Sequence, residues 1–173
     1  MRTMVKLGYV LSTSRGSTDP LLVDIAGKLA ARGRVVAGIV QSRAPTDRDH
    51  PCDMDLVVLP DGPQIAIAQQ LGALSRGCRL DPASLEQAAE AVQQSLSRDA
   101  DVLIVNKFGA QECKGRGFSS AFGLALNLGI PVLTAVNEMN LQGFLDFAGG
   151  LETRLSQDED EILAWLCDPI VSA

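Results

Sequence analysis

VKLGYVLSTSRGSTDPLLVDIAGKLAARG, residues 5–33, predicts a strand, a polar loop and an amphipathic helix in that order. The apolar strand is expected at residues 5–11, and the helix from Pro20 to about Gly33, because apolar residues recur there at helical spacing. Asp19 followed by Pro20 is a helix-start signal, with the carboxylate as the expected cap. The loop Ser12–Asp19 therefore leads from a strand end to a helix N-terminus, a layout that binds phosphate.

The next apolar run, Arg34–Gln41, is rich in β-branched residues and too short for a buried helix. It predicts a buried parallel strand, so that the chain opens with a right-handed βαβ unit. Further strands are expected at Asp101–Phe108, which looks central, and at Pro131–Val136. Met54–Leu59 and Gln64–Ala68 flank a Pro-Asp-Gly turn signal and predict a hairpin at a sheet edge.

Helical patterns alternate with these strands almost throughout the chain. They begin at Asp81-Pro82, run through Phe118–Leu128 and Asn140–Ala148, and end with Asp158–Leu166, whereas Leu71–Leu80 and Ser42–Asp53 are expected to be loops. Such alternation predicts a three-layer α/β domain over residues 1–173, with a mostly parallel sheet and helices on both faces. Ligands of such sheets bind beyond the carboxyl ends of the strands.

Composition excludes several classes of function. The net charge of −6 argues against broad binding of nucleic acid or anionic membranes, which requires a positive field. No apolar run reaches membrane-spanning length, and the N-terminus lacks a secretory pattern. The four cysteines form no CxxC pair, so a cytoplasmic protein with reduced thiols is expected, without a disulfide framework or zinc ribbon.

Positive charges nevertheless gather in the predicted loops. Arg15, Lys107, Lys114 and Arg116 follow strands whose carboxyl ends are expected to meet at one edge of the sheet. With backbone N–H groups of the first helix they predict a pocket for phosphate or another oxyanion. The alternative is that they are solvated charges that offset neighbouring carboxylates. The predicted ligand-binding residues are Ser14, Arg15, Gly16, Ser17, Thr18, Arg76, Arg79, Asn106, Lys107, Lys114 and Arg116, with Arg76 and Arg79 as a cover over the pocket.

The first loop lacks the lysine of the phosphate-binding motif G-x-x-x-x-G-K-[ST]. Registration on the following apolar pair Leu21-Leu22 places Thr18 at the lysine position and Asp19 at the Ser/Thr position. The buried strand that would carry a magnesium-binding Asp ends instead in Asn106-Lys107. We therefore expect phosphate capture without efficient phosphoryl transfer. An ordinary βα turn is the alternative for this loop.

Residues 106–117 form the densest functional-looking segment, with an amide, two lysines, an arginine, a carboxylate and a thiol. A flexible glycine-hinged loop is the alternative. Cys113, near Lys114 and Arg116, is a candidate for a lowered thiol pKa. No metal site is expected, since His50 and Cys52 lie in a loop with too few ligands.

The segments GCRLDP at residues 77–82, LIVNKFG at 103–109, GRG at 115–117 and PVLTAVN at 131–137 resemble a bacterial family known only as a domain of unknown function. Members of that family are often encoded near molybdenum-uptake genes and labelled as ATP-binding subunits of molybdate transporters. The family is in turn similar to P-loop nucleoside-triphosphatases with a dethiobiotin-synthetase-like fold. The resemblance implies a P-loop-like fold, a nucleotide, phosphate or molybdate as ligand, and a link to molybdate handling.

Three functions are compatible with these observations. The first is a nucleotide- or oxyanion-binding protein with an altered phosphate loop, without catalytic residues assigned. The second is a divergent NTPase or a ligase-type transferase, which would release phosphate in the presence of magnesium. The third is a protein-interaction module with a vestigial pocket and a partner in metal uptake or cofactor assembly.

Overall fold

The computed structural model describes residues 5–14, 16–41, 55–66, 68–70, 78–80, 82–96 and 99–168, with only the backbone described at residues 66, 68–70, 78–80 and 82. The predicted loop Ser42–Asp53 lies outside these residues. The strands are β1 (Leu7–Ser12), β2 (Val36–Gln41), β3 (Asp55–Leu59), β4 (Gln64–Ala66), β5 (Ala68–Gln70), β6 (Cys78–Leu80), β7 (Val102–Val105), β8 (Val132–Asn137) and β9 (Glu152–Leu155). The helices are α1 (Asp19–Ala31), α2 (Pro82–Leu96), α3 (Ala110–Cys113), α4 (Ser119–Asn127), α5 (Glu138–Ala148) and α6 (Glu159–Cys167).

Within the described residues the main sheet has the strand order β4-β3-β2-β7-β8-β1-β9. Strands β2, β7, β8, β1 and β9 run parallel, and β3 and β4 add an antiparallel edge. The predicted central strand and the edge hairpin are therefore confirmed. The predicted strand-helix-strand order β1-α1-β2 is also present, with β7 and β8 between the two strands in the sheet. Because the five parallel strands share one direction, their carboxyl ends open on the same edge of the sheet.

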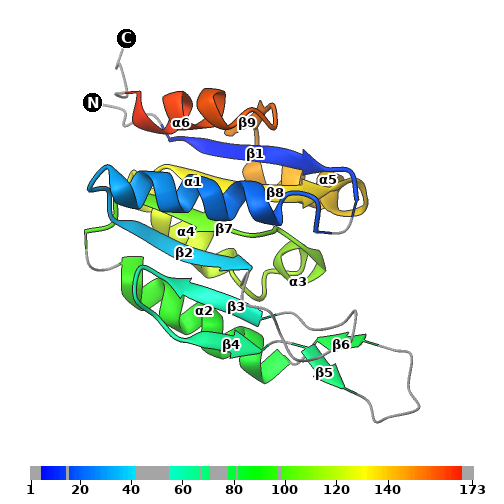
Figure 1. Cartoon of the computed structure of the whole chain (residues 1–173). Coiled ribbons are helices and arrows are strands. Elements are labelled where there is room, and N and C mark those ends of the chain that lie inside the picture. Colours follow the sequence, from blue (N-terminus) through cyan, green and yellow to red (C-terminus); the bar gives the residue numbers. More distant parts are fainter. Residues whose placement is uncertain are drawn as a thin grey trace.

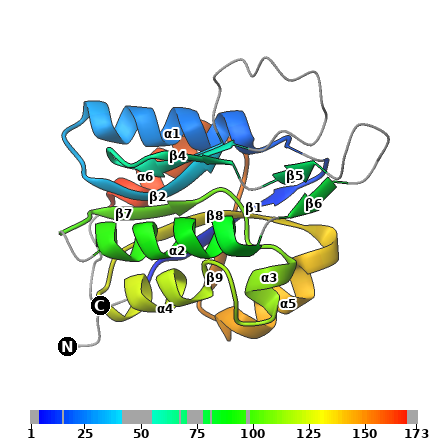
Figure 2. The same ribbon diagram turned by 90° about the horizontal axis from the view of Figure 1, so that it is seen from below.

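Helices cover both faces of this sheet, as Figures 1 and 2 show. One face packs Leu7, Tyr9 and Val105 with apolar residues of α2, α4 and α5. The other packs Val10 and Ile104 with α1 and α6. Side chains alternate between the faces along a strand, and both faces are buried, which explains the nearly continuous apolar runs in the sequence. The predicted three-layer α/β architecture is confirmed.

Several local predictions differ from the structure. The segment Gly109–Gly117 contains the short helix α3, and the predicted loop at Leu71–Leu80 contains β6, which pairs with β5. Strand β9 was not predicted, because its ETRL sequence lacks the apolar run of a buried strand and it lies at the sheet edge beside β1. Asp19 is the first residue of α1 rather than its cap, since the Leu22 N–H already donates to the Thr18 carbonyl at 3.1 Å.

None of the helices in the described residues is both long enough and apolar enough to span a bilayer.

Candidate functional site

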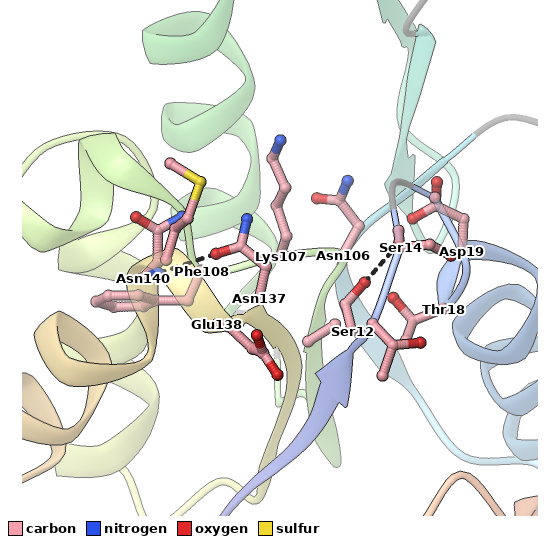
Figure 3. A pocket seen from close by; sticks show the side chains of 14 residues that line it. Ser12, Ser14, Thr18, Asp19, Asn106, Lys107, Phe108, Asn137, Glu138 and Asn140 are labelled. Carbon is pink, nitrogen blue, oxygen red and sulfur yellow. Dashed lines mark hydrogen bonds between the residues drawn. The ribbon is translucent and has the colours of Figure 1, made fainter.

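A cavity of about 500 Å³ lies at the carboxyl edge of the sheet, where β1, β7 and β8 end (Figure 3). Its three walls come from segments far apart in the sequence. The loop wall is Ser12, Thr13, Ser14, Gly16, Thr18 and Asp19; the β7 wall is Asn106, Lys107 and Phe108; the β8–α5 wall is Ala135, Asn137, Glu138, Met139 and Asn140.

The loop wall is held by its own hydrogen bonds. The Ser12 hydroxyl donates to the Ser14 carbonyl at 2.9 Å and lies 3.2 Å from the Ser17 hydroxyl. The Ser17 N–H also donates to the Ser14 carbonyl, and the Asp19 N–H to that of Gly16. Gly16 has a φ of +72°, which favours glycine over residues with a side chain. These bonds bend the chain into a turn that brings the backbone and the N-terminus of α1 to the cavity.

Asp19 places a carboxyl group in this wall. It is half-buried, and burial raises its pKa, while the neighbouring Lys107 ammonium acts in the opposite direction. Its Oδ2 lies 3.3 Å from the position that a Cβ would take at Gly16, so the carboxyl group folds back over the turn. An anion in the cavity therefore meets a carboxyl group whose charge is opposed by Lys107.

In the β7 wall, Asn106 is a buried polar residue, 6% exposed. Its backbone N–H donates to the Ile39 carbonyl at 3.0 Å, which anchors it between β2 and β7. Its side chain lines the cavity (Figure 3). An amide in this position can donate a hydrogen bond to a ligand oxygen.

Lys107 is exposed and is the one cation among the described lining residues of this cavity. Its backbone is fixed by Phe108, which is buried, donates its N–H to the Ala135 carbonyl at 2.9 Å and packs its ring edge-on against Phe122. The backbone that carries the ammonium is therefore well anchored, and the charge of Lys107 acts on the carboxyl group of Asp19.

The β8–α5 wall is built from the start of α5. Asn137 ends β8 and caps the helix, because its Oδ1 accepts a hydrogen bond from the Asn140 N–H at 2.9 Å. Glu138 and Met139 then lie exposed at the cavity, with Met139 90% exposed. This wall adds a second carboxylate and a second helix N-terminus.

The segment after Lys107 carries a buried carboxyl group, Glu112, which is 5% exposed. Its Oε1 accepts from the Gly109 N–H at 3.5 Å, and Glu86 accepts from the Gly117 N–H at 3.3 Å. Burial raises the pKa of Glu112 to about 7, with a smaller contribution from Glu86. The two carboxyl groups thus hold both ends of the segment 109–117.

Glu112 should make the stability of the fold depend on pH. Its pKa rises from 4.5 to about 7 on folding, so the folded state holds a proton that the unfolded state has lost. Stability should therefore fall between pH 4.5 and 7, by up to about 3 kcal/mol from this group. Glu112→Gln should remove this contribution. Urea unfolding should therefore show that the free energy of unfolding of the variant, relative to that of wild type, is higher at pH 8 than at pH 5. Glu90→Gln, at an exposed position on α2, is the control. If the stability difference between Glu112→Gln and wild type is the same at pH 5 and pH 8, the prediction is contradicted.

The structure brings together five of the predicted ligand-binding residues: Ser14, Gly16, Thr18, Asn106 and Lys107. Ser17 lies within hydrogen-bond distance of Ser12 but does not line the cavity. Lys114 and Arg116 are exposed after α3 and do not line it either. Arg15 and Arg76 lie outside the described residues, and only the backbone of Arg79 is described, in β6.

Ser12, Thr13 and the residues Asn137–Asn140 also line the cavity, although they were not among the predicted ligand-binding residues. A signal for Asn137 was available, because it follows β8 as Asn106 follows β7. The hypothesis of a lowered Cys113 pKa is wrong, since burial of the thiol and the adjacent Glu112 raise that pKa, and the alternative of an incidental cysteine remains. His50 and Cys52 lie outside the described residues, and within the described part no group of three or more His, Cys, Asp or Glu side chains could hold a metal.

Comparison with known proteins agrees with this fold. A curated relative, "Molybdenum import ATP-binding protein ModC 2" of Bradyrhizobium diazoefficiens, is 35% identical over 163 residues. The match covers 94% of this chain but only 18% of the relative, so the chain spans about a fifth of that protein's length. The crystal structure of THEP1 from Aquifex aeolicus superposes with a TM-score of 0.69 at 13% identity, over 95% of this chain and all of that one. The two chains therefore share a fold. The family model described as "Protein of unknown function (DUF2478)" matches residues 7–165, and the chain belongs to that family.

Proposed function

We propose that this chain binds a nucleoside phosphate, with the phosphates in the cavity between α1 and Lys107, and does not hydrolyse it efficiently. The observation that carries the proposal is the placement of the buried Asn106 and of Lys107 at one wall of the cavity that Gly16 and Thr18 also line. The fold supports the same ligand class. So does the relative named as an ATP-binding protein, whose sequence match covers 94% of this chain.

Each wall would contribute to phosphate binding in a different way. The N-terminus of α1 offers backbone N–H groups and a partial positive charge. Gly16, without a side chain, lets an oxygen approach the backbone of the turn. Lys107 would supply the lysine that the loop lacks, from a different strand, and the Asn106 amide would donate to a phosphate oxygen.

Efficient hydrolysis requires residues that this cavity does not hold at the usual places. Standard P-loop enzymes use a loop lysine on the phosphates, a Ser/Thr on magnesium and an acidic residue after a buried strand. Here Thr18, Asp19 and Asn106-Lys107 occupy the corresponding positions in the sequence. We therefore assign the cavity to binding rather than to phosphoryl transfer.

The oxyanions phosphate and molybdate are the alternative ligands. The relative named for molybdenum import favours molybdate, and a lysine, a helix N-terminus and an amide suit any small oxyanion. In that case the protein would act in molybdate handling, together with a protein partner in metal uptake or cofactor assembly.

Calorimetric titration of the whole chain with ATP, GTP, tripolyphosphate, phosphate and molybdate tests these ligands against one another, with and without magnesium. We expect ATP or GTP to bind, and phosphate release to stay at the background rate. Binding of molybdate alone would support the oxyanion alternative, and magnesium-dependent phosphate release would support a divergent NTPase. Failure of ATP, GTP and tripolyphosphate to bind would overturn the proposed function.

A further inference from the structure

A second cavity of about 440 Å³ lies beside the first, at the ends of β1 and β9. Thr13 lines both cavities, so they lie on either side of this one residue. The second cavity is otherwise formed by Leu11 of β1 and by Arg154, Leu155, Ser156 and Gln157 at the end of β9. Parallel pairing places β9 directly beside β1 (Figure 1).

The two cavities differ in chemistry. The first holds a lysine, two carboxyl groups, several hydroxyl groups and amides. The second is lined by the half-buried Leu11, the buried Leu155 and the exposed Arg154, and it lacks acidic residues among its described lining. Arg154 is exposed and makes no ion pair within the described residues. Aliphatic surface beside an unpaired planar guanidinium suits a flat, heteroaromatic group.

The walls of the second cavity are held in place without a ligand. The Gln157 amide donates to the Leu11 carbonyl at 2.8 Å, which ties the segment after β9 to the end of β1. The Ser156 hydroxyl donates to Glu161 at 2.7 Å, and Asp158 accepts from the Glu161 N–H at 3.2 Å. The cavity is thus anchored to the first turn of α6, and a ligand would meet a formed surface rather than one it must order.

We propose that this second cavity holds the base of the nucleotide whose phosphates occupy the first cavity, with Arg154 stacked on the base. Thr13 then lies where the sugar joins the two halves of the ligand. Arg154 is the residue that makes the site prefer a nucleotide over a bare polyphosphate. The inference rests on the proposed function, since it places the remaining part of the same ligand.

The test compares ATP and GTP with tripolyphosphate, which has the phosphates but no base, in calorimetric titrations of the whole chain. Wild type should bind a nucleotide more tightly than tripolyphosphate. Arg154→Ala should weaken nucleotide binding roughly ten-fold and leave tripolyphosphate binding unchanged. Arg154→Lys should behave like the alanine variant, because an ammonium keeps the charge but loses the planar stacking surface. Arg34→Ala, an exposed arginine just before β2, is the matched control and should change neither affinity.

Each other result has a distinct meaning. If Arg154→Ala weakens both ligands equally and Arg154→Lys restores them, Arg154 binds phosphate and the inference is wrong. If nucleotide and tripolyphosphate bind with equal affinity in all variants, the second cavity takes no base, while the proposed function stands. If no ligand binds, the proposed function itself has failed. Thermal unfolding of each variant, followed by circular dichroism, verifies that this exposed edge-strand substitution leaves the fold intact.

Discussion

Replacing Lys107 by alanine is expected to weaken the binding of ATP, GTP and tripolyphosphate alike, by roughly 30-fold. Lys107 is the one cation among the described residues that line the first cavity. Its loss would remove a charge-assisted contact to phosphate and leave the carboxyl group of Asp19 without its opposing charge. The affinities should be measured by calorimetry at one fixed ionic strength, because exposed charges are screened by salt.

Lys114→Ala is the matched control for this prediction. Lys114 is an exposed lysine of the same segment that does not line the cavity, so its removal lowers the net charge equally without touching the ligand. Equal losses in the two variants would mean that the anion is attracted by general charge, and would contradict a specific role for Lys107. Adding Asp19→Asn to Lys107→Ala should recover part of the affinity, since it removes the carboxyl group that repels phosphate.

Replacing Gly38 by alanine is expected to prevent folding or to cost more than about 4 kcal/mol of stability. Gly38 lies in β2 between β3 and β7, opposite Leu59 and Ile104. A Cβ at this position would lie 1.8 Å from the Ile104 carbonyl oxygen, which belongs to the backbone of the central strand. Its φ of +130° is also one that residues with side chains rarely adopt. Neither the oxygen nor the strand can move without breaking the sheet.

Gly27→Ala provides the contrast, because this helical glycine of α1 has no atom within 4 Å of the added Cβ. It should stabilise the protein by about 0.5–1 kcal/mol, since alanine is the better helix former. Urea unfolding of both variants is the measurement. A Gly38→Ala protein as stable as wild type would contradict the register of β2 against β7.

Strands β2, β7 and β8 could be predicted from the sequence because each is buried on both faces and reads as a short apolar run. Strand β9 could not, since an edge strand needs no such run and its Glu152 and Arg154 resemble loop residues. Strand β6 could not be predicted either, because its sequence has no strand pattern of its own and it forms by pairing with β5.

The candidate site divides in the same way. Asn106 and Lys107 could be predicted to face Gly16, because polar residues that follow parallel strands gather at one edge of the sheet. Lys114 and Arg116 also follow a parallel strand in the sequence. The short helix α3 comes between that strand and these two residues, and they do not line the first cavity. The start of α5 was missed because nothing in its own sequence marks it as a wall of this cavity.

Three features can be read from the amino-acid sequence: the chain is an alternating α/β protein, its first loop leads into a helix N-terminus, and this loop lacks the usual lysine. These features follow from local patterns of polarity and from residue identity. The effect of the Lys107 charge on Asp19 and the second cavity beside Thr13 become visible only in the folded chain. Both depend on the order of strands β7, β8, β1 and β9, which pairs segments more than a hundred residues apart such as Leu7 with Val132 and Glu152. That order is set by how the whole core packs, so no single stretch of the sequence contains it.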